Sequence, residues 1–152
     1  MSQVVAPCSG AVLPVTECVD PVFAGQIVGP GVVIDPPDGE STAVAPIAGT
    51  VVKVHPHAFV VAGADVGVLV HLGINTVRLE GRGFGVHVEQ GAHVEAGDPV
   101  ITWNPGELPA EVDGQEISRQ VPVIVLDVPA DSLRLDGLPA EVRAGDPLFA
   151  SS

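Results

Sequence analysis

The sequence predicts an all-β fold, an antiparallel β-sandwich or flattened barrel with an internal duplication and little helix. The first observation is composition: valine dominates, 18 glycines and 15 prolines interrupt the chain, and aromatic residues make up only 3%. Branched residues favour strands, while glycine and proline favour the turns between them. The second observation is that no long stretch has the 3.6-residue period of an amphipathic helix. The third is that two kinds of segment each occur twice.

The first repeated segment is Ala-Pro-x-x-Gly-x-Val, in VVAPCSGAV at 4–12 and AVAPIAGTV at 43–51. Its proline stands where a strand begins, and its glycine stands at a tight turn before branched residues that suit a strand. The second segment occurs as EAGDPV at 95–100 and RAGDPL at 143–148. Each copy predicts a turn that leads into an apolar strand. Two pairs of related units indicate a duplicated fold.

The apolar runs between turn signals predict short strands within a single domain that covers residues 1–152. Loops are expected at 35–41 and at 104–116, the second with one short helical turn. The run at 118–128 is apolar in its second half and fits a core strand. The predicted strands are Val4–Val5, Ala11–Val15, Gln26–Ile34, Thr50–Val54, Ala58–Ala62, Val66–Leu72, Val100–Trp103 and Val121–Leu126.

The segment VLVHLGINTV at 68–77 presents His71 from an alternating apolar strand that ends at a glycine. Together with the run that starts at His57, it predicts a β-hairpin whose loop is residues 63–65. In an antiparallel pair, the numbers of opposite residues have a constant sum, and this loop places His57 opposite His71. Both rings would then lie on one face, with Cβ atoms about 5 Å apart. A slip of one residue would send them to opposite faces.

Charge and length exclude several classes of protein. The net charge is −13, with only six Lys and Arg residues, so the chain lacks the basic surface that nucleic-acid binding needs. An acidic protein is better suited to a basic protein surface. No apolar run approaches the roughly 20 residues that span a bilayer, and no secretory leader is visible. Cys8 and Cys18 lack CxxC spacing, which indicates reduced thiols. We therefore expect a cytoplasmic protein without direct membrane insertion.

Two histidines that face each other across a hairpin suit phosphoryl transfer. A neutral imidazole nitrogen can attack a phosphoryl group and later release it, and a second imidazole can donate a hydrogen bond to the phosphoryl oxygens. The remaining work is positioning and charge stabilisation. His87 and His93 flank a turn around Gly91, and we expect them to be surface residues without a role.

Metal binding is the first alternative. His55, His57 and His71 together offer a three-histidine zinc site with one position open for water. Pro56 distorts the strand between the first two, which weakens this geometry.

A biotinyl or lipoyl carrier is the second alternative, because APIAGTVVKV at 45–54 is similar to segments of those domains. Such carriers attach their cofactor to a lysine at a hairpin tip. The only lysine is Lys53, inside a predicted strand, so the similarity is expected to be one of fold.

The chain as a whole resembles the glucose-type IIA component of the bacterial phosphoenolpyruvate-dependent sugar phosphotransferase system. The specific match is a strand histidine followed by x-Gly-Ile-x-Thr-Val at 71–77, with His-Ala-Phe at 57–59 before it. Further matches are VVAPCSGAVLPV, DPVFAGQIVGPGVVIDP, APIAGTVVKV and VEAGDPV, and together they span nearly the whole chain.

The resemblance implies a phosphotransferase with a phosphohistidine intermediate. His71 would take a phosphoryl group from the phosphorylated histidine-containing phosphocarrier protein and pass it to the IIB domain of a membrane sugar permease. His57 would support the transfer. No cofactor is implied, apart from zinc as an ion shared with a partner at His57 and His71. Regulated transporters or kinases are implied as further partners.

The resemblance also implies a docking surface. Asp20 matches an acidic residue that meets arginines of the phosphocarrier protein, and Asn75 stands where an aspartate is common. His55 stands where the family often has a threonine that hydrogen-bonds the active histidine, so a different group must orient His71. The residues that match the family's apolar docking patch are Val22, Phe23, Ile27, Val28 and Phe59.

Overall fold

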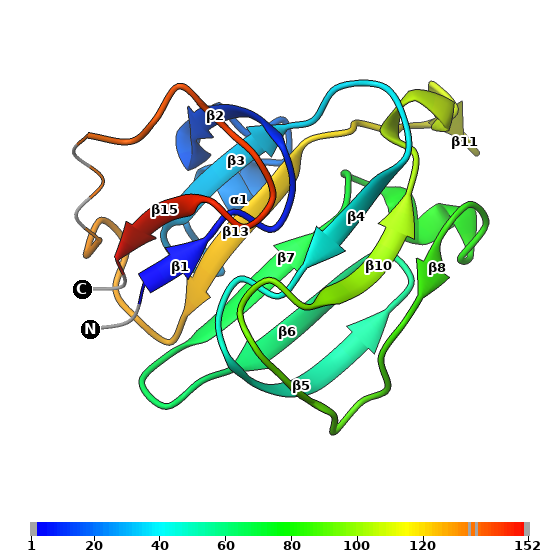
Figure 1. Cartoon of the computed structure of the whole chain (residues 1–152). Coiled ribbons are helices and arrows are strands. Elements are labelled where there is room, and N and C mark those ends of the chain that lie inside the picture. The colour runs from blue at the N-terminus through cyan, green and yellow to red at the C-terminus, as the bar shows by residue number, and fades with distance from the viewer. Residues whose placement is uncertain (1–2, 134, 136, 151–152) are drawn as a thin grey trace.

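The computed structural model describes residues 3–133, 135 and 137–150, and it confirms an all-β protein with little helix. Its largest element is an antiparallel sheet of eight strands in the order β14-β2-β3-β13-β7-β6-β5-β9 (Figure 1). These strands are β2 (Gly10–Pro14), β3 (Gly31–Asp35), β5 (Gly49–His55), β6 (Ala58–Ala62), β7 (Gly67–His71), β9 (His93–Val94), β13 (Val121–Leu126) and β14 (Glu141–Val142).

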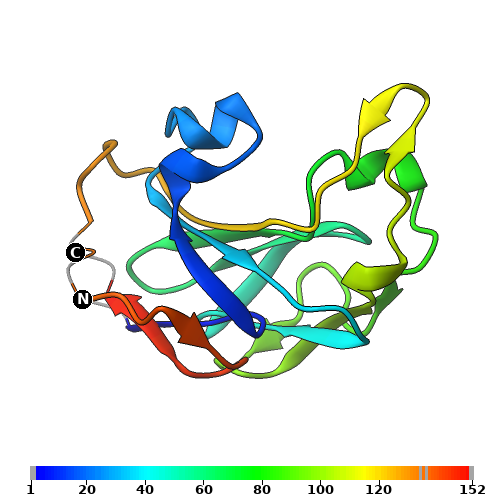
Figure 2. The same ribbon diagram turned by 90° about the horizontal axis from the view of Figure 1, so that it is seen from above.

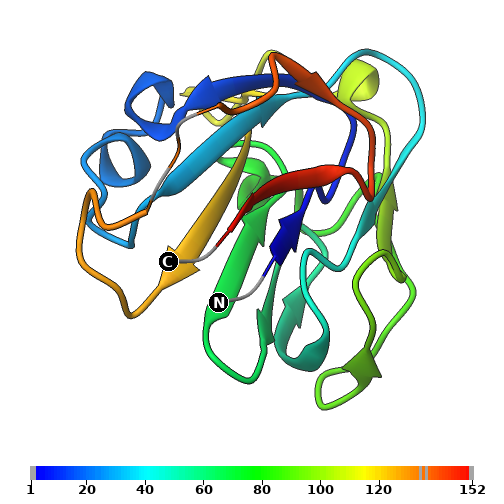
Figure 3. The ribbon, with the colours of Figure 1, turned by 60° about the vertical axis from the view of Figure 1, so that its left-hand side comes forward.

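Three smaller antiparallel sheets complete the strand inventory of the described residues. The first pairs β1 (Gln3–Val5) with β15 (Pro147–Ala150), which lie side by side in Figure 3. The second joins β4 (Ser41–Val44), β10 (Pro99–Trp103) and β8 (Gly85–Val86), and the third is the hairpin of β11 (Glu111–Val112) and β12 (Gln115–Glu116). The short helices are η1 (Val15–Glu17), α1 (Pro21–Ala24), η2 (Thr76–Leu79) and η3 (Pro105–Glu107).

The main core lies between the large sheet and the layer made by the first two small sheets. Alternate residues of the central strands, such as Val68 and Val70 of β7, point into it, and Trp103 and Phe149 enter from the opposite layer. The other face of the large sheet carries a second, smaller cluster around Phe23, Val33 and Ile124, which α1 covers. Figure 2 shows β1 and β15 on one side of the large sheet and α1 on the other.

The predicted duplication is confirmed in the hydrogen bonds. Each Ala-Pro-x-x-Gly unit binds one x-Ala-Gly-Asp-Pro unit: the Ala6 N–H donates to the Asp146 carbonyl, and the Ala45 N–H donates to the Asp98 carbonyl. In both acidic turns the aspartate side chain accepts from the backbone three residues before it, at 2.8 and 2.9 Å. The two halves meet through reciprocal bonds from Val5 to Pro46 and from Val44 to Pro7.

The repeated glycines have a steric reason. Gly10 and Gly49 open the equivalent strands β2 and β5, with φ of 148° and 159°. A Cβ at Gly10 would lie 2.4 Å from the Asp35 carbonyl oxygen, and a Cβ at Gly49 would lie 2.2 Å from that of Ala62. Only glycine tolerates such an approach of a neighbouring strand. The duplication therefore includes this backbone contact.

The predicted strands Ala58–Ala62 and Val121–Leu126 have the observed bounds. The segment 104–116 contains the expected short helical turn, η3, but it is not only a loop, because its second half forms the hairpin of β11 and β12. The predicted strand Gln26–Ile34 is wrong in its first half, because β3 begins only at Gly31 and Gln26 has a left-handed φ of 56°. Helix α1 and strand β4 were not predicted, since each has only four residues and too little periodicity to detect. Among the described residues, no helix has the length and apolarity needed to cross a membrane.

Candidate functional site

His71 is the last residue of β7 and points away from the main core. Because Val68 and Val70 point into that core, strand alternation places Leu69 and His71 on the face that α1 covers. The Phe23 ring of α1 lies against the His71 imidazole, with ring centroids 5.4 Å apart and planes at 58°. One side of the imidazole is thus packed by an aromatic ring, and the residue remains partly accessible.

The predicted hairpin is present, but its predicted register is wrong by one residue. The loop has four residues, 63–66, so Ala62 pairs with Gly67, and Ala58 stands opposite His71. His57 lies outside β6, in the two-residue turn that joins His55 to Ala58. Strand alternation does not apply in such a turn. The contact of the two rings is nevertheless confirmed, since the His57 and His71 centroids are 5.2 Å apart with planes at 70°.

A backbone carbonyl fixes the tautomer of His71. Its Nδ1 lies 2.5 Å from the Gly73 carbonyl oxygen. A carbonyl can only accept, so Nδ1 carries the proton and Nε2 keeps its lone pair. The group that orients His71 is therefore Gly73 rather than the side chain of His55. Nε2 is the nitrogen available for nucleophilic attack.

Both histidines are held neutral at rest. Burial lowers the pKa of His71, although the Gly73 hydrogen bond and the Asp20 charge act in the opposite direction. Burial also lowers the pKa of His57 to about 4, and the neighbouring His71 and His55 rings lower it further because like charges repel. A neutral imidazole is the form that can act as a nucleophile, so these shifts favour phosphoryl acceptance.

Helix α1 forms one wall of the site. The Asp20 side chain caps it by accepting a hydrogen bond from the Val22 N–H at 2.8 Å, and Pro21 occupies the first helical position. Both are standard helix-start residues. The Asp-Pro pair was thus a sequence signal from which α1 could have been predicted. The negative charge of the Asp20 carboxylate favours the protonated form of His71, and so it opposes the effect of burial on the pKa of His71.

The predicted docking patch is only partly exposed. Val22 and Ile27 are 44% and 76% exposed, and Val19, which was not predicted, is 61% exposed. Val28 is half-buried, and Phe23 is buried against the His71 ring. The assignment of Phe59 to the docking patch is wrong. At 1% exposure Phe59 belongs to the main core, because β6 turns its side chain inward.

Asn75 lies next to this surface in a left-handed conformation, with φ of 64°. Its side-chain amide donates to the Glu116 carbonyl at 2.8 Å, which ties the loop after β7 to strand β12. Asn75 and Asp20 line the same shallow groove of about 310 Å³ between α1 and the β11–β12 hairpin. Asn75 itself is half-buried.

The three-histidine zinc geometry is not formed. His55 stacks on His57 with centroids 5.9 Å apart, but no three His, Cys, Asp or Glu side chains of the described residues are arranged to hold a metal ion. His87 and His93 are exposed and contact Thr102 and Glu95, away from the site. Lys53 is exposed within β5 and not at a hairpin tip, unlike the modified lysine of a biotinyl or lipoyl carrier.

Comparison with known families and proteins supports the resemblance seen in the sequence. Residues 2–129 match the model of the family described as phosphoenolpyruvate-dependent sugar phosphotransferase system, EIIA 1. The chain is 37% identical over 142 residues to the mannose-specific EIIBCA component of Corynebacterium glutamicum, covering 91% of this chain and 20% of that protein. It is 37% identical over 125 residues to the glucose-specific EIIA component of Oceanobacillus iheyensis, covering 80% of this chain and 72% of the relative.

A solved structure shares the fold. Glucose permease IIA from Mycoplasma capricolum superposes with a TM-score of 0.82 at 30% identity, over 97% of this chain and 93% of that one. The relatives differ in length. This chain spans about a fifth of the Corynebacterium EIIBCA component and 62% of the glucose-specific EIIA component of Bacillus cereus.

Proposed function

This chain belongs to the EIIA 1 family of the phosphoenolpyruvate-dependent sugar phosphotransferase system, and we propose that it is a cytoplasmic phosphocarrier with His71 as its phosphorylated residue. The phosphoryl donor is the phosphorylated histidine-containing phosphocarrier protein. The acceptor is a cysteine of the IIB domain of a sugar permease. The names of the Corynebacterium EIIBCA and Streptococcus pneumoniae EIICBA relatives, which combine components A, B and C, support a IIB partner.

The observation that carries the proposal is the free Nε2 of a neutral, partly buried His71 whose Nδ1 proton is bound by the Gly73 carbonyl. Nε2 attacks the phosphorus of the donor phosphohistidine, so a new N–P bond forms as the donor's N–P bond breaks. The donor imidazole leaves with the electron pair of the broken bond. The Nδ1 proton stays in place throughout, and the Gly73 carbonyl stabilises the positive charge that develops on the phosphorylated ring.

The return step runs in the opposite direction. The thiolate of the IIB cysteine attacks the phosphorus, an S–P bond forms, and the N–P bond of His71 breaks. His71 then regains the neutral form with its proton on Nδ1, ready for another cycle. No resident cofactor takes part, since the phosphoryl group is carried covalently.

His57 supports the transfer as a hydrogen-bond donor to the phosphoryl oxygens. Its ring meets that of His71 edge to face at 5.2 Å, so a phosphoryl group on Nε2 comes within its reach. In the resting protein burial lowers the pKa of His57, and repulsion between its protonated ring and protonated His71 or His55 lowers that pKa further. A phosphoryl dianion reverses this electrostatic environment and favours the protonated ring, which is the better donor.

Phosphorylation in a reconstituted system tests the assignment of His71. The protein is incubated with phosphoenolpyruvate, enzyme I and the phosphocarrier protein, and mass spectrometry measures an acid-labile phosphate. We expect one phosphate in the parent and none in His71→Ala. His87→Ala is the matched control, because His87 is an exposed histidine away from the site, and it should label normally. Labelling of His71→Ala at the parental level would refute the proposal.

The zinc alternative has its own test. If the three histidines formed a zinc site, the purified protein would hold one equivalent of zinc, and each of His55→Ala, His57→Ala and His71→Ala would lose it. We expect less than stoichiometric zinc in the isolated chain, because His55 stacks on His57 instead of joining the other two rings around one point. Zinc shared with a partner at His57 and His71 would appear only when that partner is added.

A further inference from the structure

The Gly73 carbonyl fixes the tautomer of His71, and its own direction is set by the peptide unit to which it belongs. That unit also contains the Ile74 N–H, which donates to the Ser118 carbonyl at 2.8 Å. In a trans peptide the N–H and C=O groups point in opposite directions. A unit whose N–H is directed at Ser118 therefore directs its oxygen away from Ser118, toward the His71 ring.

Both backbone groups of Ile74 are hydrogen-bonded to Ser118. The Ser118 N–H returns a bond of 3.2 Å to the Ile74 carbonyl, so the two residues form an isolated antiparallel bridge. A Cβ at Gly73, where φ is 82°, would lie 2.7 Å from the Ser118 carbonyl oxygen and 2.5 Å from Cγ2 of Thr76. Residue 73 must be glycine for the loop to approach both neighbours this closely.

Thr76 closes the other end of the same loop. Its hydroxyl donates to the Leu72 carbonyl at 2.7 Å, and the side chain is completely buried. Among the residues that the structure describes, Thr76 is the only polar residue that is buried. The Leu72 N–H in turn donates to the His57 carbonyl at 2.7 Å. One hydroxyl thus joins the loop after His71 to the backbone that carries His57.

We propose that Thr76 is a positioning residue for phosphoryl transfer. With the Ile74–Ser118 bridge, its hydroxyl holds residues 72–76 so that the Gly73 carbonyl keeps the His71 proton on Nδ1 and leaves Nε2 free. The inference rests on the proposed function for its kinetic consequence. Its structural consequence, the tautomer, does not depend on that function.

The test compares a substitution that removes the Thr76 hydroxyl at constant size with one that keeps a hydroxyl. Thr76→Val replaces the hydroxyl by a methyl group and removes the donor to Leu72, whereas Thr76→Ser keeps a hydroxyl. Thr42→Val is the matched control, because it removes a threonine hydroxyl that bonds to Thr102 at 3.1 Å on another sheet. Long-range ¹H–¹⁵N correlation spectra report which imidazole nitrogen of His71 carries the proton.

We expect the parent, Thr76→Ser and Thr42→Val to show the proton of His71 on Nδ1. Thr76→Val should show a substantial Nε2–H population, and its phosphorylation rate should fall about tenfold or more because that nitrogen is then blocked. If Thr76→Val does not fold, Thr76→Ala removes the same hydroxyl with less bulk and serves in its place.

Two results would overturn the proposal. One is a parent protein whose His71 proton is on Nε2, or a folded Thr76→Val variant whose His71 proton remains on Nδ1. The other is a phosphorylation rate that falls as much in Thr42→Val as in Thr76→Val, since the loss would then follow stability alone. If no variant and no parent accepts phosphate while the spectra behave as expected, the proposed function fails and the positioning role stands.

Discussion

His57 and His71 touch each other, but different parts of the fold hold them. A hydrogen bond from Nδ1 to the Gly73 carbonyl orients His71, and the Phe23 ring packs against it. His57 stands in a tight turn between His55, which stacks on it, and His71. His71, the proposed nucleophile, is therefore fixed by the strand end and its loop, whereas His57, its proposed supporting residue, is placed by the turn between β5 and β6.

The lowered pKa of His57 predicts an acid-sensitive stability. The pKa is about 4 in the folded protein, against 6.5 ordinarily, so the unfolded chain binds more protons between these values. The contribution of the neutral His57 ring to the free energy of unfolding is fully present above about pH 6.5 and is lost as the pH falls toward 4. We expect the urea midpoint to decrease from pH 7 to pH 4.5, and to decrease less in His57→Asn.

The partly buried His71, whose pKa is also lowered, makes stability fall with pH in the same direction, so His57→Asn should reduce the pH dependence without abolishing it. Titration of the ring protons by NMR gives the independent measurement. A His57 that titrates near pH 6.5 would contradict the assigned environment.

His57→Ala is expected to retain phosphate acceptance on His71 and to slow transfer to the IIB domain by about a hundredfold, because one donor to the phosphoryl oxygens is lost. Rapid-quench measurement of each half-reaction separates the two steps. Unimpaired sugar phosphorylation by this variant would remove the role assigned to His57.

At the scale of elements, the repeated glycine at the start of β2 and β5 determines how closely the neighbouring strand can lie. Gly49→Ala is expected to lower the free energy of unfolding by about 3 kcal/mol, through an unfavourable φ and a collision with the Ala62 carbonyl. Gly91→Ala is the control, because its φ of 94° is also positive but its Cβ would meet open space. Urea unfolding of both variants measures the difference. An equal loss in the two would show that the close approach has no energetic weight.

Helix α1 and the residues beside it present apolar side chains next to His71. Val22→Asp is expected to raise the KM for the phosphorylated phosphocarrier protein about tenfold, since it places a charge in a desolvated contact, and to leave the melting temperature nearly unchanged. Val86→Asp is the matched control, because Val86 is similarly exposed, at 41%, but lies on β8. If both variants raise KM equally, the patch on α1 is not the docking surface.

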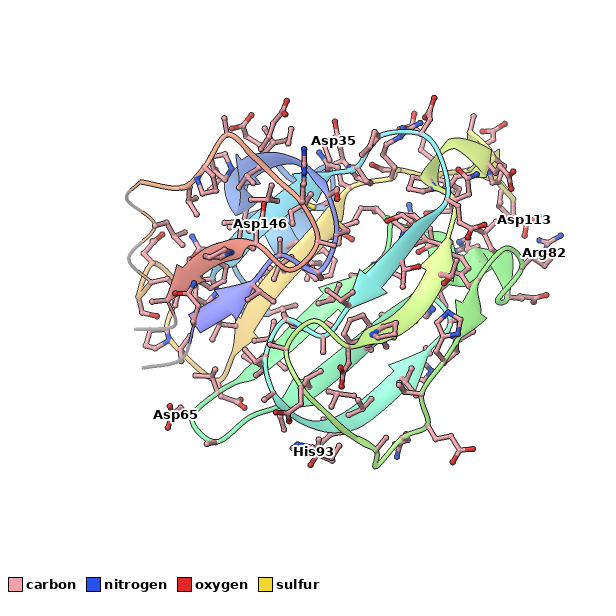
Figure 4. All side chains as sticks on the ribbon, viewed as in Figure 1. Asp35, Asp65, Arg82, His93, Asp113 and Asp146 are labelled. Carbon is pink, nitrogen blue, oxygen red and sulfur yellow. The ribbon has the colours of Figure 1, made fainter. Side chains whose placement is uncertain are left out.

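At the scale of the whole molecule, negative charge is distributed around the surface. The labelled residues Asp35, Asp65 and Asp113 lie at the top, the lower left and the right of the molecule in Figure 4. The two cysteines of the chain are free thiols in buried positions. Cys8 lies in the first Ala-Pro-x-x-Gly unit, where the two repeats meet, and burial raises its pKa to about 12.

Cys8 should therefore report global unfolding. In a Cys18→Ser background, we expect the reaction of Cys8 with a thiol reagent to be slow at pH 8 and to accelerate with urea in proportion to unfolding. The absorbance of the released thiolate measures the rate. Fast reaction without urea would show that the contact between the repeats opens locally.

Much of the fold followed from local pattern. The sequences of β6 and β13 alternate or run apolar over their full length, so both strands were predicted with their observed bounds. The repeated units predicted the duplication because each repeats a turn that only certain residues can form. Of the patch residues named by resemblance, Phe23 does lie against the His71 ring, whereas Phe59 was misplaced because one residue of register decides which face it occupies.

The sequence by itself determined the strand-rich fold, its duplication and the identity of the two histidines, because strand period and turn chemistry are local properties. The tertiary structure alone decided the register of the hairpin, the contact of His57 through a turn, and the proton position on His71. Each of these depends on groups distant in the chain, such as the Ser118 carbonyl that orients the Gly73 peptide. Backbone hydrogen bonds of this kind leave no mark in the side-chain pattern from which a sequence is interpreted.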